Sequence, residues 1–336
     1  MIFASKSYYP DENCFPCLLC HLEVTDDYTY LGIVFSYNGN FNKAIDKQIT
    51  AATRALFILQ KKAKILKLPI DLQIELFDKT VLPILLYGSE VWGFSKNVLR
   101  IEIFYRKFLK GLLHLNSRTP NPMVYGETGK TDISINIKER MVNFWTRLHH
   151  GKQSKMSVIL FKVVKGMHDD PLSGYKSEWI NFVKNVFDST GFNNLWYEAP
   201  IVLTQNNFPS NYPVWLKKSL NLRLNDIFKQ VWHSQLQSNR NCTNYRLFKD
   251  DHCFENYLTS LSDVDRIALS KFRCRSIKLP VVNSGSSVGD VSCLCKLCDL
   301  KETGDEFLYI LKCLFFCKGQ KETFENKQQE KQLLAF

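Results

Sequence analysis

The sequence predicts a mainly α-helical protein with a short β-hairpin near its N-terminal end and a small cysteine-rich module near its C-terminal end. Three observations predict this class. Apolar and polar residues alternate before residue 40, apolar residues recur at intervals of three and four beyond it, and clusters of Pro and Gly separate the periodic stretches. Hydrophobic residues make up 45 % of the 336 residues, so the chain can bury a core.

Residues 1–40 predict extended structure. MIFAS is typical of a short strand. The stretch HLEVTDDYTYLGIVFS alternates and is rich in β-branched and aromatic residues, and Asn38-Gly39 supplies a turn after it.

Residues 41–150 predict a helical domain. Its first helix ends before Pro69, because proline cannot continue a helix. The apolar face of this first helix consists of Phe41, Ile45, Ile49, Ala52, Leu56, Leu59 and Ala63.

The second helix of this domain begins after Asp71. Leu72, Leu76 and Phe77 form its expected apolar stripe, and Pro83 is expected to kink or divide it. A third helix over about residues 96–116 is broken by SRTPNPMVYGETGKT, which contains two prolines and two glycines, and a fourth begins near residue 136.

The remainder of the chain is less regular in pattern. Residues 151–290 predict a helical connection domain, residues 291–320 the cysteine-rich module, and residues 321–336 a polar tail. We find no internal repeat.

Positive charge is concentrated on two of the expected helices. The 44 Lys and Arg residues exceed the 33 Asp and Glu residues by 11. Residues 54–67 contain no acidic residue, and residues 96–118 contain only Glu102. The basic residues of the first stretch are Arg54, Lys61, Lys62, Lys64 and Lys67; those of the second include Arg106, Lys107 and Lys110. Such a distribution is typical either of contact with nucleic-acid phosphates or of an ordinary solvated helix face.

The composition also bears on the compartment. No apolar run approaches the roughly 20 residues of a membrane span, and the first ten residues lack the apolar core of a signal peptide. The eleven cysteines are therefore interpreted as reduced thiols or metal ligands in a nuclear or cytoplasmic protein without membrane contact.

Several segments occur together in a recognisable order. They are YLGIVFSYNGNFNKAI, LPIDLQIELFDKTVLPILLYGSEVWGF, RTPNPMVYGETG, SEWINFVKNVFDSTGFNNLW, NYRLFKDDHCFENYLTSL and ALSKFRCRSIKLP, followed by C-x-x-C and GDEFLYILKC. In this order the chain resembles the C-terminal part of the reverse transcriptase polyproteins of non-LTR retrotransposons, the jockey-like LINE elements. The resemblance covers most of the chain.

This resemblance implies a role for each region. Residues 1–40 would be the end of a polymerase palm, and residues 41–150 a thumb-like helical bundle that holds a template–primer duplex by its backbone. The implied phosphate contacts are Arg54, Lys61, Lys62, Lys64, Lys67, Arg106, Lys107 and Lys110.

The resemblance also implies that the catalytic part lies upstream of the segment ending in YLG. Such polymerases use palm aspartates to hold two Mg²⁺ ions, and Asp26-Asp27 stands directly against the YLG segment, where the family carries ordinary acidic and polar residues. We therefore assign no catalytic residue, and Mg²⁺ becomes a cofactor only if the catalytic palm is supplied. The chain is expected to be truncated.

The C-terminal cysteines form two close pairs joined by a longer loop. Cys295, Cys298, Cys313 and Cys317 have the spacing C-x2-C-x14-C-x3-C, which suits tetrahedral Zn²⁺. The family carries a histidine where this chain has Leu308, which cannot ligate. Two interpretations stay open, a zinc knuckle completed by Cys317 or thiols that pack as small hydrophobic residues.

A second cluster, CFPCLLCH, contains Cys14, Cys17, Cys20 and His21. Its ligands are crowded in sequence, and the family has no motif at this place. We interpret it as incidental.

The leading functional hypothesis is a non-catalytic, reverse-transcriptase-derived protein that binds nucleic-acid duplex, RNA–DNA or DNA, without reading its sequence. One alternative is the C-terminal part of an active RNA-directed DNA polymerase whose catalytic region lies upstream. Another is an inert or protein-binding helical remnant. The sequence makes no prediction of the oligomeric state.

Overall fold

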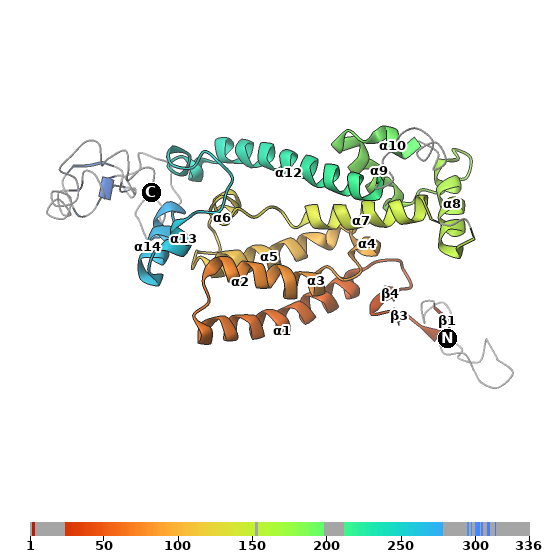
Figure 1. Cartoon of the computed structure of the whole chain (residues 1–336), viewed down its shortest axis with the longest axis horizontal. Coiled ribbons are helices and arrows are strands. Elements are labelled where there is room, and N and C mark those ends of the chain that lie inside the picture. Colours follow the sequence, from red (N-terminus) through yellow and green to blue (C-terminus); the bar gives the residue numbers. More distant parts are fainter. Residues whose placement is uncertain are drawn as a thin grey trace. The chain divides into compact units, whose positions relative to one another are not determined.

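The computed structural model is built mostly of α-helices, with a short antiparallel hairpin near the N-terminal end (Figure 1), which confirms the predicted fold class. It describes residues 2–3, 24–151, 154–197 and 212–277, together with 294, 295, 297, 300–302, 304, 308, 309 and 313. Contacts divide the described chain into two compact units. Unit 1 comprises the residues up to Phe104 and Asp132–Ile227, and unit 2 comprises Tyr105–Thr131 and the residues from Phe228 onward.

The elements follow one another in this order. The strands are β1 (Ile2–Phe3), β2 (Val24–Thr25), β3 (Asp27–Tyr30) and β4 (Ile33–Ser36). The first helices are α1 (Asn42–Leu66), α2 (Ile70–Leu76), η1 (Phe77–Val81), α3 (Leu82–Leu85), α4 (Ser89–Trp92), η2 (Lys96–Val98), α5 (Leu99–Leu112), α6 (Asn121–Thr128) and α7 (Ser134–His149). They are followed by α8 (Met156–Asp169), α9 (Glu178–Thr190), α10 (Asn193–Tyr197), α12 (Tyr212–Ser238), η3 (Arg240–Cys242), η4 (Tyr245–Leu247), α13 (Tyr257–Ser260) and α14 (Asp263–Arg273).

The predicted extended stretch folds into a tight hairpin. Strands β3 and β4 are antiparallel, with Asp27 opposite Ser36 and Tyr30 opposite Ile33. The two residues between the strands, Leu31 and Gly32, both have positive φ, +46° and +83°. A two-residue loop of this kind matches the natural twist of paired strands, although leucine is an unusual occupant of the first position.

Helix α1 confirms the predicted first helix. Ile45, Ala52 and Ala63 are buried, and the other members of the predicted apolar face are half-buried. The helix ends at Lys67, which adopts a left-handed conformation (φ +47°), and the Leu68 amide then donates to the Ala63 carbonyl at 3.0 Å.

The second predicted helix contains a π turn. Helices α2, η1 and α3 follow one another directly, and η1 has the wider π geometry immediately before α3, in which Pro83 stands. The π turn accommodates the proline, which can neither donate a backbone hydrogen bond nor fit against a regular preceding turn. The predicted stripe was partly wrong, because Leu72 is exposed; the buried side chains are Ile70, Ile74, Phe77 and Val81.

The core of unit 1 is rich in aromatic side chains. Trp92 of α4, Trp145 of α7 and Phe187 of α9 are completely buried. The Trp145 ring stacks on Trp196 with 5.4 Å between ring centroids. Gly93 allows α4 to approach α7 closely, because a Cβ atom at this position would overlap the Ile137 side chain.

Unit 2 contains a buried ion network around α6. The Glu127 carboxylate accepts from the Arg273 guanidinium at 3.0 and 3.1 Å, from the Tyr245 hydroxyl at 2.9 Å and from the Tyr257 hydroxyl. Arg273 also pairs with Glu255 at 3.2 Å. Glu127 and Arg273 are 0 % and 3 % exposed, so this network holds together the interior of unit 2.

Helix α6 lies in the stretch that the sequence marked as a break between helices. The break is real, since Pro120 and Gly129 flank α6, but the eight residues between them form a helix whose side chains from Pro122 to Thr128 are buried. Trp232 of α12 donates its indole N–H to the Pro122 carbonyl at 2.7 Å.

Candidate nucleic-acid interface

The basic residues of α1 face outward. Helix α1 turns its small and aliphatic face inward, and this leaves the opposite face to solvent. Arg54, Lys61, Lys62, Lys64 and Lys67 are all exposed and form no ion pair with any other described residue. No acidic residue occurs between Asp46 and Asp71 that could neutralise them from the same helix. We refer to these five residues as the α1 basic face.

Apolar side chains alternate with the cations on this face. Arg54, Ile58, Lys61 and Ile65 are spaced by four, three and four residues, so they lie on one side of the helix. Ile58 is 55 % exposed and Ile65 69 %, and Phe57 beside them is 68 % exposed. The α1 basic face therefore offers both positive charge and apolar surface to a partner.

The predicted contacts on α5 differ from those on α1. Lys107 is exposed, whereas Arg106 and Lys110 are half-buried. Lys110 donates from Nζ to the Ser117 carbonyl at 2.8 Å, and burial together with the nearby Arg106 charge lowers the pKa of its amine. These three residues belong to unit 2 and the α1 basic face to unit 1, so each set is described by itself.

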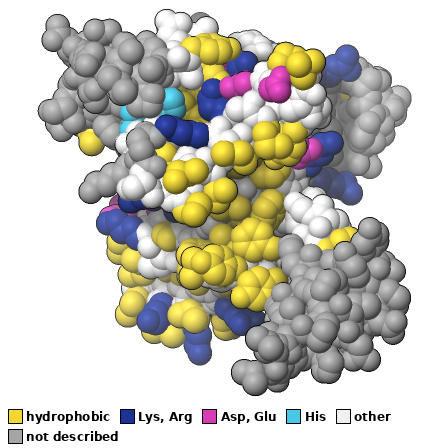
Figure 2. Space-filling view, turned by 90° about the vertical axis from the view of Figure 1, so that its right-hand side faces the viewer, with side chains coloured by type: hydrophobic (Ala, Val, Ile, Leu, Met, Phe, Trp, Pro, Cys, Tyr) yellow, Lys and Arg dark blue, Asp and Glu magenta, His cyan; other side chains and the backbone are white. Residues whose placement is uncertain are grey.

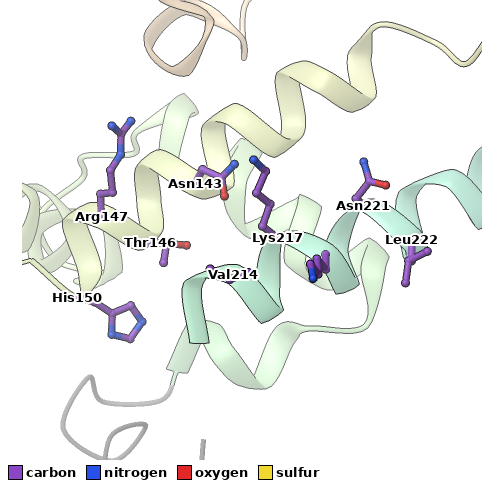
Figure 3. A pocket seen from close by; sticks show the side chains of 9 residues that line it. Asn143, Thr146, Arg147, His150, Val214, Lys217, Asn221 and Leu222 are labelled. Atoms are coloured by element: carbon purple, nitrogen blue, oxygen red, sulfur yellow. The ribbon is translucent and has the colours of Figure 1, made fainter. Parts of the chain in front are cut away.

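A groove between α7 and α12 in unit 1 adds cations that the sequence analysis did not single out (Figure 3). The groove has a volume of about 1090 Å³, and residues of both helices line it. Its lining residues are Asn143, Thr146, Arg147, His150, Val214, Lys217, Lys218, Asn221 and Leu222. The described part of this lining contains three permanent cations and no carboxylate, and burial lowers the pKa of the His150 ring.

One carboxylate stands close to this groove. Glu139 accepts from the Asn221 amide, and the Lys217 charge acts on it, although burial raises its pKa overall. Two adjacent lysines, Lys217 and Lys218, could have indicated a basic site, but they occur in a long amphipathic helix where such pairs are common. Nothing in the sequence indicated that these lysines lie in the same groove as Arg147.

Figure 2 looks onto the side of unit 1 on which α8 lies. Hydrophobic side chains gather there between scattered Lys and Arg, and few acidic side chains are visible. On α8 itself the exposed residues Met156, Ile159, Leu160, Val163 and Met167 recur at helical spacing. This surface is apolar rather than basic.

Asp27 has a structural environment. Its carboxylate accepts from the Ser36 hydroxyl across the hairpin at 2.6 Å and pairs with Lys43 in the first turn of α1. The hydrogen bond from Lys43, followed by the one from Ser36, lowers the pKa of this carboxyl. The side chain therefore ties the hairpin to α1.

The structure describes two of the four predicted zinc ligands. Cys295 and Cys313 are buried in a small cluster with Leu308, and Tyr309 packs against it. Cys298 and Cys317 lie outside the described residues, as do Cys14, Cys17, Cys20 and His21. Among the residues that are described, no group of three or more His, Cys, Asp or Glu side chains is arranged to hold a metal. Zinc binding by the cysteine quartet stays a prediction.

None of the described helices combines the length and the apolar character needed to cross a membrane. Comparisons with protein-family models, with curated proteins and with solved structures found no match to this chain.

Proposed function

We propose that this protein binds nucleic-acid duplex through the α1 basic face without reading the base sequence. One observation carries the proposal: four exposed cations on α1, and a fifth at its C-terminal cap, form no ion pair within the described part of the chain. Unpaired surface cations neutralise phosphates and release condensed counterions, which drives association with a polyanion. A helix is a rigid support, so the contacts fix the position of the duplex.

Two further features support a duplex rather than a small anion. The cations extend over more than three helical turns, from Arg54 to Lys67, about 20 Å at 1.5 Å per residue, which is the scale of several successive phosphates. The resemblance to reverse transcriptases implies a thumb-like helical region over the same residues, which contacts the template–primer duplex.

The proposal is tested by removing charge from this face without changing its shape. We expect Lys61→Gln with Lys64→Gln to weaken binding to a primer–template duplex equally for unrelated sequences. The slope of log K against log salt is expected to fall by about two, because each lost phosphate contact removes roughly 0.9 from it. Fluorescence anisotropy over a salt series measures both quantities.

The matched control removes two exposed lysines elsewhere in unit 1. Lys79→Gln with Lys155→Gln changes the net charge by the same amount and is expected to leave the salt slope within 0.5 of the unaltered protein, a margin of about half a phosphate contact. If both double variants behave alike, the α1 basic face has no special role. Its exposed Phe57, Ile58 and Ile65 would then favour a protein partner.

A further inference from the structure

A polar pocket of about 510 Å³ lies within unit 2 at the N-terminal end of α6. Its walls come from the end of α5, the segment before α6, the start of α6 and the end of α12. Lys110 and Arg118 contribute positive charge, and the described residues that line the pocket include no Asp or Glu. The lining is therefore suited to an anion.

A buried hydroxyl in this lining has no partner. Thr119 is 5 % exposed, and its Oγ1 makes no hydrogen bond to any described residue. Buried hydroxyl groups in folded proteins nearly always have a partner, because losing hydrogen bonds to water is unfavourable. A bound oxyanion would supply the missing acceptor.

The start of α6 adds backbone donors. Pro120 occupies the N-cap position and offers no side-chain acceptor, so the first-turn amides of Asn121 and Met123 are not capped by it. The N-terminal end of a helix also carries partial positive charge, which favours an anion. Pro122, in the same turn, has no N–H, so Asn121 and Met123 carry the N–H groups at this end of the helix.

Lys110 closes one side of the pocket in a fixed position. Its Nζ donates to the Ser117 carbonyl at 2.8 Å, which holds the amine beside the segment that contains Arg118 and Thr119. An ammonium group has three donors, so this bond leaves others for a ligand. The charge, the orphaned hydroxyl and the helix end thus meet in one cavity.

We propose that this pocket binds a phosphate group, and that in the nucleic-acid complex it holds one phosphate of the backbone. Phosphate offers several acceptor oxygens for the Lys110, Arg118 and Thr119 donors at once. The second half of the inference rests on the proposed function, whereas the first half does not. The pocket would give unit 2 a fixed backbone contact of its own.

The test distinguishes loss of the Thr119 hydroxyl from loss of the folded structure. Thr119→Val removes Oγ1 at nearly constant volume, and Thr119→Ser retains a hydroxyl; because Oγ1 has no partner, Thr119→Val is expected to fold normally. Inorganic phosphate is titrated into the full chain and followed by calorimetry, and duplex affinity is measured by anisotropy. We expect Thr119→Val to weaken both about tenfold, which corresponds to 1.4 kcal/mol, and Thr119→Ser to weaken them less. Lys229→Gln, an exposed lysine of unit 2 outside the pocket, is the charge control.

Each outcome decides one part of the proposal. Equal phosphate affinity for Thr119→Val and the unaltered chain overturns the pocket. Loss of phosphate affinity with unchanged duplex affinity assigns the pocket to free phosphate or a phosphomonoester and overturns the backbone contact. If the α1 variants do not weaken duplex binding, the phosphate titration still tests the pocket. The two proposals can therefore be rejected independently.

Discussion

The α1 basic face and the Arg273 network use positive charge in opposite ways. Arg273 is 3 % exposed and pairs with two carboxylates, Glu127 and Glu255. The five residues of the α1 basic face are exposed and form no ion pair with described residues. A buried guanidinium needs its carboxylates, because an unpaired charge in the interior is very unfavourable. The exposed cations are solvated by water and need no carboxylate, so they are available to a partner.

The comparison is tested most strongly by breaking the buried network. Glu127→Ala is expected to lower the free energy of unfolding by about 3–5 kcal/mol, because it leaves the buried Arg273 with Glu255 as its remaining carboxylate and two tyrosine hydroxyls without their Glu127 acceptor. Urea unfolding of the full chain measures the change. Glu75→Ala, which removes the exposed partner of Lys79, is the control and should change the free energy by less than about 1 kcal/mol. Equal effects would contradict the structural importance of the buried pair.

A smaller effect in the same unit is expected from pH. Burial is the largest cause that lowers the pKa of His252 below its ordinary value of 6.5, and the Lys249 and Lys229 charges act in the same direction. The unfolded chain therefore takes up the proton more readily than the folded one. The stability from the neutral ring is fully present above pH 6.5 and is lost as the pH falls through the folded-state pKa.

His252→Gln tests this pH dependence. Glutamine can still donate to the Lys130 carbonyl, which His252 Nε2 contacts at 3.0 Å, but it does not titrate. Urea midpoints measured from pH 7.5 to 5 should fall less steeply in this variant. The pKa values of His114, His150 and His168 are also lowered, so a residual slope is expected. An unchanged slope would show that His252 does not contribute.

The smallest effect on stability is expected for the α1 basic face. Lys61→Gln with Lys64→Gln should change the free energy of unfolding by less than about 0.5 kcal/mol, because neither side chain pairs with a residue that the structure describes. Thermal unfolding in the absence of nucleic acid measures this. A loss comparable to that of Glu127→Ala would mean that these lysines hold the fold together.

The sequence predicted the helices whose pattern is local. The apolar face of α1 follows directly from residues at intervals of three and four, and the exposure of its cations follows from that face. The buried Glu127 was not predicted, because YGETG has the composition of a surface loop and Arg273 stands 146 residues away. The polar pocket at the start of α6 was missed for the same reason, since Thr119 and Asn239 are brought together only by packing within unit 2. Predicted segment boundaries follow chain order, whereas both compact units combine separate stretches.

The π turn at Phe77–Val81 sets the rotational phase of everything that follows it along this helical run. A π turn contains one residue more than an α turn of the same height, so it offsets the side chains beyond it by about 100°. Leu85 and Leu86, which follow this turn, are buried. Converting the π turn to an α turn at constant chain length would rotate these leucines by about 100°, whereas deleting one residue from η1 would restore a regular hydrogen-bond ladder and leave their direction unchanged. The extra residue and the wider turn therefore compensate for each other.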